Sequence, residues 1–217
     1  MNLKKKGRIR NASIARNSFV TKRAEIKVSA LADVFKIAAG ERWVQTESGV
    51  LQRKLFFSGF HYLDSLQLVY NWENRFMSVN YNLQMISVFP TDNNRFEKTD
   101  DCLFTLNCTQ NGLRGKRNYS WKCNQWKEDE AKLNAYIERL NNPFILERLD
   151  ALDIMEMEIR HEDSWDHWRV SCESIIGSAT WILIPPVLSM ITPKLEECIK
   201  FLELYELLGD ALVNNKV

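Results

Sequence analysis

Two histidines and several carboxylates lie within the segment His161-Glu162-Asp163-Ser164-Trp165-Asp166-His167, which is the densest group of metal-ligating residue types in the chain. Imidazole and carboxylate groups together bind divalent cations, and His favours zinc, nickel or copper. On an extended strand His161 and His167 would stand roughly 20 Å apart, so they can share an ion only if the chain folds back between them. A metal-dependent hydrolase with His161, Asp163 and His167 as ligands is one hypothesis. The alternative is a solvated hairpin tip, where acidic residues are common.

Basic residues gather at the beginning of the chain. The first 27 residues hold nine Lys or Arg against one acid, Glu25, whereas the whole chain has a formal net charge of +1. The remainder is therefore acidic. Such asymmetry indicates a partner, which could be nucleic acid, an anionic membrane surface or an acidic groove of another protein. The candidate contacts in this arm are Lys4, Lys5, Lys6, Arg8, Arg10 and Arg16.

A second basic cluster is interleaved with aromatic residues. Cations beside flat rings suit single-stranded nucleic acid, because phosphates attract charge and bases stack on rings. Strand alternation offers another explanation, in which Tyr119 and Trp121 point into the core and the charges are merely solvated. A nucleic-acid-binding protein that uses the arm and this cluster is the second hypothesis. The candidate contacts here are Arg114, Lys116, Arg117 and Lys122.

Sequence motifs of the common enzyme classes are absent. The chain has no G-x-x-x-x-G-K-[ST], G-x-G-x-x-G, G-x-S-x-G or H-E-x-x-H, and it holds only three His. No catalytic residue and no cofactor is predicted. The sequence therefore favours a protein without catalytic activity, although carboxylate chemistry is not excluded.

The composition is that of a globular protein. Of 217 residues, 45% are hydrophobic and 26% are charged, which fits one domain of ordinary size. The five cysteines are odd in number and form no C-x-x-C pair, so we expect reduced thiols and a cytoplasmic location. The longest apolar run, 179–191, is broken by Pro185-Pro186 and is shorter than the ~20 residues that a membrane-spanning helix needs. We expect no membrane span.

Hydrophobic periodicity predicts an α+β fold, an antiparallel sheet flanked by three main helices. The first half reads as a helix followed by an antiparallel meander, and residues 22–217 are expected to form one compact domain behind a basic arm, 1–21. Helical spacing predicts helices over 22–39, 133–140 and 193–213, and alternation predicts strands near 43 and over 51–57, 66–72, 77–85, 102–108, 119–123, 152–160, 165–172 and 175–184.

The last predicted helix is apolar over more of its circumference than one contact requires. Either the sheet and a neighbouring helix cover it, or a second chain does. The leading hypothesis takes the second option, a non-enzymatic accessory or adaptor subunit that binds another protein or self-associates through this helix, while its arm engages an acidic partner. The predicted interface residues are Leu195, Ile199, Phe201, Leu202, Leu204, Tyr205 and Leu208.

Overall fold

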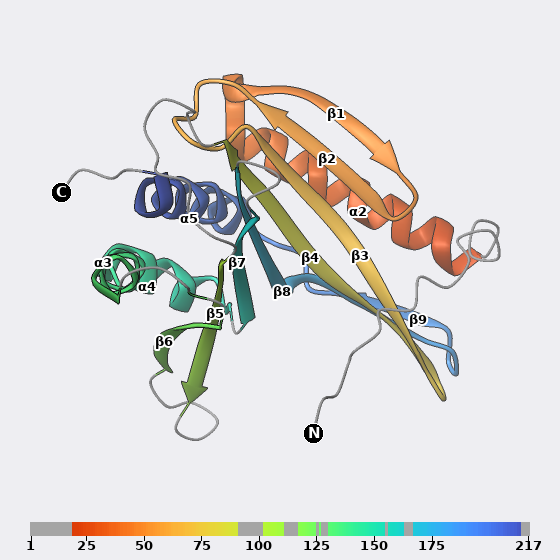
Figure 1. The fold of residues 1–217 in the computed structure, drawn as a ribbon. Helices are drawn as coiled ribbons and strands as arrows, with labels where there is room; N and C mark the ends of the chain where they lie inside the picture. Colours follow the sequence, from red (N-terminus) through yellow and green to blue (C-terminus); the bar gives the residue numbers. More distant parts are fainter. Residues whose placement is uncertain are drawn as a thin grey trace.

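The computed structural model describes residues 19–90, 102–110, 117–124, 126, 130–154, 156–162 and 167–213 (Figure 1). Most of the expected basic arm thus lies outside the described residues. The elements in chain order are α2 (Phe19–Ala39), a 3-10 turn η1 (Gly40–Arg42), β1 (Trp43–Gly49), β2 (Gln52–Phe57), β3 (Ser65–Arg75), β4 (Ser78–Pro90), β5 (Cys102–Gln110), β6 (Arg117–Cys123), α3 (Glu130–Leu140), α4 (Pro143–Ala151), β7 (Glu156–Glu162), β8 (His167–Ile182), β9 (Val187–Met190) and α5 (Leu195–Val213).

The strands form one nine-stranded antiparallel sheet with the order β1-β2-β3-β4-β8-β7-β5-β6, and β9 pairs with β8. The meander from β1 to β4 agrees with the sequence prediction. It does not continue into β5, because β4 pairs with β8 and the β5–β6 hairpin lies at the far edge beside β7. The chain is α+β, and a single hydrophobic core contains buried residues from α2 through α5.

One face of the sheet is buried beneath the helices. Along β3 buried and partly exposed positions alternate, with Leu66, Leu68 and Tyr70 pointing into the core. In β4 the opposing Leu83 and Met85 are fully buried. This is the alternation that a sheet with one wet face requires. The helices pack against the buried face (Figure 1).

The C-terminal helix α5 lies within its own subunit, which corrects the predicted interface. It packs against α2, where the Phe35 and Phe201 rings lie 6.1 Å apart, and also contacts α3, α4 and β4. Five of the seven predicted interface residues are therefore buried by the chain itself: Phe201, Leu202, Leu204, Tyr205 and Leu208. Leu195 and Ile199 alone of that set are exposed. Neighbouring elements of the same chain cover the broad apolar face of α5 on several sides, which was the first of the two alternatives.

Several elements differ from the sequence prediction, among them β9 (Val187–Met190), which was not predicted, and β7, which begins at Glu156 and not at 152. Four α-helices, not three, occur within the described residues, because Asn142 and Pro143 begin α4 where we expected only the end of α3. The Asn142 side chain accepts a hydrogen bond from Phe144 N at 2.9 Å, and Pro143 occupies the first turn, where its missing N–H costs nothing. The predicted strands 165–172 and 175–184 are one long strand, β8, which passes through Gly177 at φ +90°.

None of the described helices is long and apolar enough to cross a membrane.

Candidate binding groove

The predicted metal ligands do not converge. His161 pairs with Trp168 across β7 and β8, whereas His167 pairs with Glu162. Because neighbouring residues of a strand point to opposite faces, the two imidazoles lie on opposite faces of the sheet. His161 is buried, with its ring 4.8 Å from the Trp168 ring. The predicted His161–His167 pair is therefore wrong, and Asp163 lies outside the described residues. Within the described part, no three His, Cys, Asp or Glu side chains gather to hold a metal.

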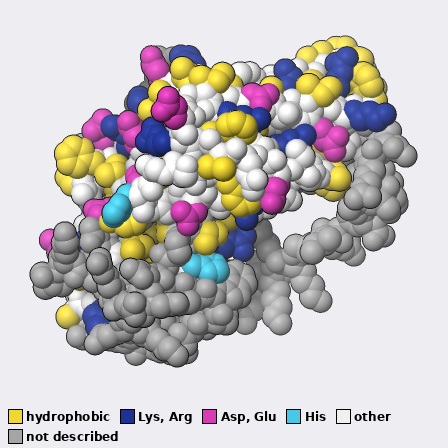
Figure 2. Space-filling model, turned by 90° about the horizontal axis from the view of Figure 1, so that it is seen from above, with side chains coloured by type: hydrophobic (Ala, Val, Ile, Leu, Met, Phe, Trp, Pro, Cys, Tyr) yellow, Lys and Arg dark blue, Asp and Glu magenta, His cyan; other side chains and the backbone are white. Residues whose placement is uncertain are grey.

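Of the second basic cluster, the structure describes Arg117 and Lys122. Arg117 pairs with Asp153 and, at 3.6 Å, with Asp150, so carboxylates already neutralise its charge. Trp121 is buried and donates its indole N–H to Leu140 O at 3.2 Å. Lys122 follows Trp121 directly and so points to the other face of β6. On the face seen in Figure 2, Lys and Arg are intermingled with Asp and Glu.

The remaining predicted nucleic-acid contacts, Arg114, Lys116 and the six arm residues from Lys4 to Arg16, lie outside the described residues.

A groove of about 400 Å³ opens where α4, α5, the end of α2 and the loop 58–64 meet. Its floor is apolar, and its walls carry two arginines and two glutamates. The lining residues are Ala38, Arg42, Phe60, Phe144, Arg148, Ile199, Leu202, Glu203, Glu206 and Leu207. The volume falls in the range of ligand sites, about 300–1,000 Å³.

Arg42 forms one wall, at the end of the 3-10 turn that follows α2. Its guanidinium carbon lies 4.1 Å from the centre of the Phe60 ring, a cation–π contact, and its Nε donates to Ala39 O at 3.4 Å. Gly59 precedes Phe60 at φ +81°, a backbone conformation that L side chains rarely adopt, so the glycine permits the turn that places Phe60 beside Arg42. The two terminal nitrogens have no acceptor among the residues that the structure describes. The Phe60 ring thus orients the Arg42 guanidinium, and its two terminal nitrogens are open to an anionic group.

Glu206 of α5 holds the loop that carries Phe60. Its carboxylate accepts backbone hydrogen bonds from His61 N at 2.8 Å, Tyr62 N at 3.0 Å and Leu63 N at 2.8 Å. The Tyr62 hydroxyl donates to Asp210 at 2.9 Å, and burial together with this carboxylate raises the pKa of Tyr62 to about 12. The loop 58–64 is therefore fixed on α5, and the charge of Glu206 is used internally.

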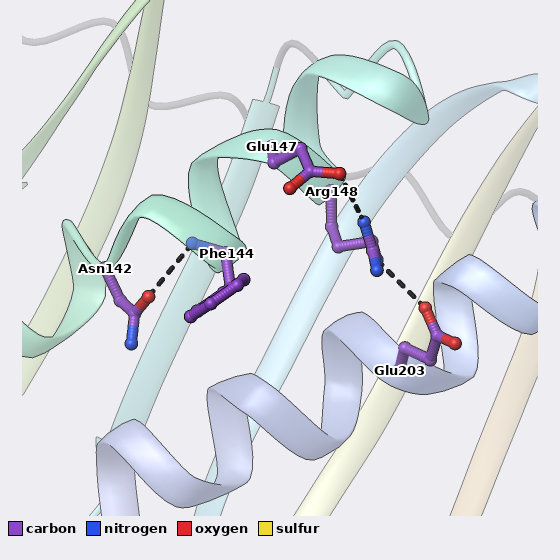
Figure 3. Close-up of polar contacts among 5 residues, drawn as sticks. All are labelled: Asn142, Phe144, Glu147, Arg148 and Glu203. Atoms are coloured by element: carbon purple, nitrogen blue, oxygen red, sulfur yellow. Dashed lines mark hydrogen bonds and ion pairs between the residues drawn. The ribbon is translucent and has the colours of Figure 1, made fainter.

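The opposite wall belongs to α4 (Figure 3). Arg148 pairs through Nε with Glu203 at 2.9 Å and through Nη1 with Glu147 at 2.8 Å, so its charge is compensated. Phe144, in the first turn of α4, is 63% exposed. Ile199 is also exposed, and Leu195 lies one helical turn before it on the same side of α5. Phe144 and Ile199 line the groove, and Leu195 extends this apolar surface beyond it.

This arrangement favours binding over catalysis. The lining contains no His, Cys, Ser or Thr, so it offers no nucleophile–base pair. Glu203 and Glu206 are both committed to internal partners, and the pair Arg148–Glu203 is neutral. What remains is an apolar floor beside a single open guanidinium. These groups are suited to an apolar group that carries one negative charge.

The family model described as "Protein of unknown function (DUF3156)" matches residues 35–212. The chain belongs to this family. No curated protein and no solved structure matches it. The DUF3156 region contains every residue that lines the groove, from Ala38 to Leu207, whereas the basic arm precedes it.

The sequence prediction missed Arg42, Phe60 and Phe144. They come from three separate segments, and nothing in their local spacing connects them. One signal did exist for Phe144, because Asn142-Pro143 is a helix-starting pair and an exposed aromatic follows it in the first turn. Recognising α4 would have placed Phe144 in the first turn of a helix, whereas its exposure and its place beside α5 follow only from the fold.

Proposed function

We propose that the protein is a non-enzymatic binding protein, an accessory or adaptor subunit whose groove receives an apolar segment of a partner protein that carries one carboxylate. The observation that supports this most is the Arg42 guanidinium, which lies over Phe60 beside an apolar floor with its terminal nitrogens open. A carboxylate would complete these hydrogen bonds with bidentate geometry.

A protein partner fits this surface better than a small molecule does. A ligand confined to about 400 Å³ would contact Phe144 and Ile199, which line the groove, but it would leave the exposed Leu195 beside them in water. A protein segment that fills the groove also covers its rim, and protein interfaces are centred on such aromatic and arginine side chains. Of the interface residues predicted from the sequence, the exposed Leu195 and Ile199 are thus the ones that would contact the partner.

The proposal also includes a role for the basic arm and a cytoplasmic location for the protein. Six Lys or Arg and no acid in residues 1–18 would draw an acidic partner toward the molecule before docking. All five cysteines are unpaired, which favours a reducing compartment such as the cytoplasm.

The test places a photo-cross-linking amino acid at Phe144 in cells that produce the full chain. A matched control carries it at Ile26, which is 66% exposed on α2 and distant from the groove. We expect a protein adduct at 144 that is absent at 26. Adding Arg42→Gln should lower its yield about tenfold, since a charge-assisted hydrogen bond contributes roughly 1.5–3 kcal/mol.

The control for that substitution is Arg53→Gln, because Arg53 donates to the backbone oxygens of Gly49 and Gln52 in the β1–β2 hairpin. It should leave the adduct unchanged. Equal yields at positions 144 and 26, or no response to Arg42→Gln, would refute the groove as a partner site.

A further inference from the structure

Two hairpin turns lie side by side at one end of the sheet (Figure 1). The first, Phe76-Met77, joins β3 to β4, and the second, residues 183–186, joins β8 to β9. Since β4 pairs with β8, Ser78 lies opposite Ile182, and Leu183 N donates to Met77 O at 3.0 Å. The two turns therefore end at the same level and form one surface.

This surface is apolar and exposed. Phe76 is 98% exposed and Ile184 is 72% exposed, and their neighbours in both turns are also exposed. Single exposed apolar residues are ordinary on a soluble protein, but a contiguous group of large ones marks an interaction surface. We define the apolar tip as Phe76, Met77, Ile182, Leu183, Ile184 and Val187.

The tip is also free of net charge. The twenty residues from Ser174 to Pro193 contain no Asp, Glu, Lys or Arg. On the other hairpin, Glu73 and Arg75 pair with each other at 3.1 Å and cancel. The six tip residues themselves carry no charge whose loss of hydration would oppose entry into an apolar environment.

Positive charge stands at the base of the tip. The Phe19 ring, at the start of α2, lies 6.0 Å from the Trp181 ring, and Trp181 directly precedes Ile182. The Arg23 guanidinium carbon lies 4.5 Å from the Phe19 ring and 5.8 Å from the Trp181 ring. Residues 1–18, with six Lys or Arg and no acid, are joined to the described structure at this point.

We propose that the apolar tip inserts into the interfacial region of an anionic phospholipid bilayer, while Arg23 and the basic residues before α2 attract its headgroups. Apolar burial plus attraction of cations to anionic lipid is the combination that holds peripheral proteins on membranes. Two projecting turns need no complementary recess in a bilayer, whereas a protein partner would have to supply one. A second copy of the chain would bring its own basic arm to the same place.

The apolar tip is separate from the groove, although both proposals use the charge of the basic arm. Phe19 and Ala38 lie near opposite ends of α2, which has 21 residues and so extends about 30 Å. Membrane contact at one end leaves the partner groove accessible at the other.

The experiment is flotation of the full chain with vesicles of phosphatidylcholine alone and of phosphatidylcholine with phosphatidylglycerol at about three to one. We expect binding to the anionic vesicles that weakens as salt rises. The double variant Phe76→Ser/Ile184→Ser should bind at least about tenfold more weakly, because two large apolar side chains no longer reach the bilayer.

Phe144→Ser is the matched control, because it removes an exposed aromatic from the groove and leaves the tip intact. It should float like the wild type, so a failure of the partner proposal is distinguished from a failure of this one. Absence of flotation with the wild type, or flotation lost on replacing Lys4, Lys5 and Lys6 by Gln but unchanged in the double tip variant, would overturn the inference. So would light scattering that shows an oligomer which the tip variant dissolves while no vesicle binds.

Discussion

Leu63 donates its backbone N–H to the Glu206 carboxylate at 2.8 Å, although the two residues are 143 positions apart in sequence. With His61 and Tyr62, three successive N–H groups converge on this one side chain. A carboxylate of α5 thus holds the aromatic wall of the groove in place. The groove therefore depends on a residue that no ligand needs to touch.

Replacing Glu206 by Gln tests this relationship. The amide has one acceptor oxygen in place of two, and its NH₂ group faces donors, so we expect the free energy of unfolding to fall by about 1–3 kcal/mol. Urea denaturation measures the change. Glu196→Gln, at an exposed position of the same helix, is the control and should stay within about 0.5 kcal/mol of the wild type. If the two variants denature alike, Glu206 does not anchor the loop.

Gly177→Ala should destabilise the sheet strongly. Gly177 has a φ of +90°, and an added Cβ would lie 2.6 Å from Leu83 Cδ2 and 3.1 Å from Leu31 Cδ2. Backbone strain and overpacking together predict a loss of about 2–4 kcal/mol. Gly40→Ala separates the two causes, because Gly40 has a φ of +60° but open space around its missing Cβ. A calorimetric loss for Gly177→Ala no greater than that for Gly40→Ala would contradict the packing described here.

Alkaline pH should lower the stability of the folded protein. Burial raises the pKa of Cys172 from its ordinary value of 9.0 to about 11, and burial with Glu197 raises that of Cys198 to about 12. A raised pKa in the folded state means that the fold prefers the neutral thiol. This contribution to stability is complete below about pH 9 and is lost as the pH rises toward 12.

Thermal unfolding midpoints measured from pH 7 to 12 check this expectation. The midpoint should decline above about pH 9, and Cys198→Ala should make the decline shallower because one buried ionisable group is gone. A midpoint that stays level through this range, or an identical slope in the variant, would count against it.

Strict alternation made the β3–β4 hairpin predictable. Leu66, Leu68, Leu83 and Met85 repeat every second residue, and only a strand with one buried face needs that spacing. The partner of β4 was not predictable, because β8 is distant in sequence and nothing local specifies which strand edge it meets. Alternation also predicted correctly that Trp121 points inward.

The sequence correctly predicted that α5 has a broad apolar face. It did not predict that elements of the same chain, and not a second chain, cover that face. Phe201, Leu204 and Leu208 show that several surfaces surround the helix, whereas periodicity cannot say whether those surfaces belong to the same chain. The two histidines illustrate the same limit. Their proximity in sequence was clear, yet a one-residue offset in register sends the rings to opposite faces.

The pairing of β4 with β8 has a consequence for folding. The centre of the sheet joins segments that are far apart in the chain. Its formation therefore costs the conformational entropy of closing a long loop before any hydrogen bond between β4 and β8 can form. During synthesis the β1–β4 meander emerges with an unpaired strand edge that stays open until β8 leaves the ribosome. Fragments that end before His167 should therefore associate edge to edge rather than fold.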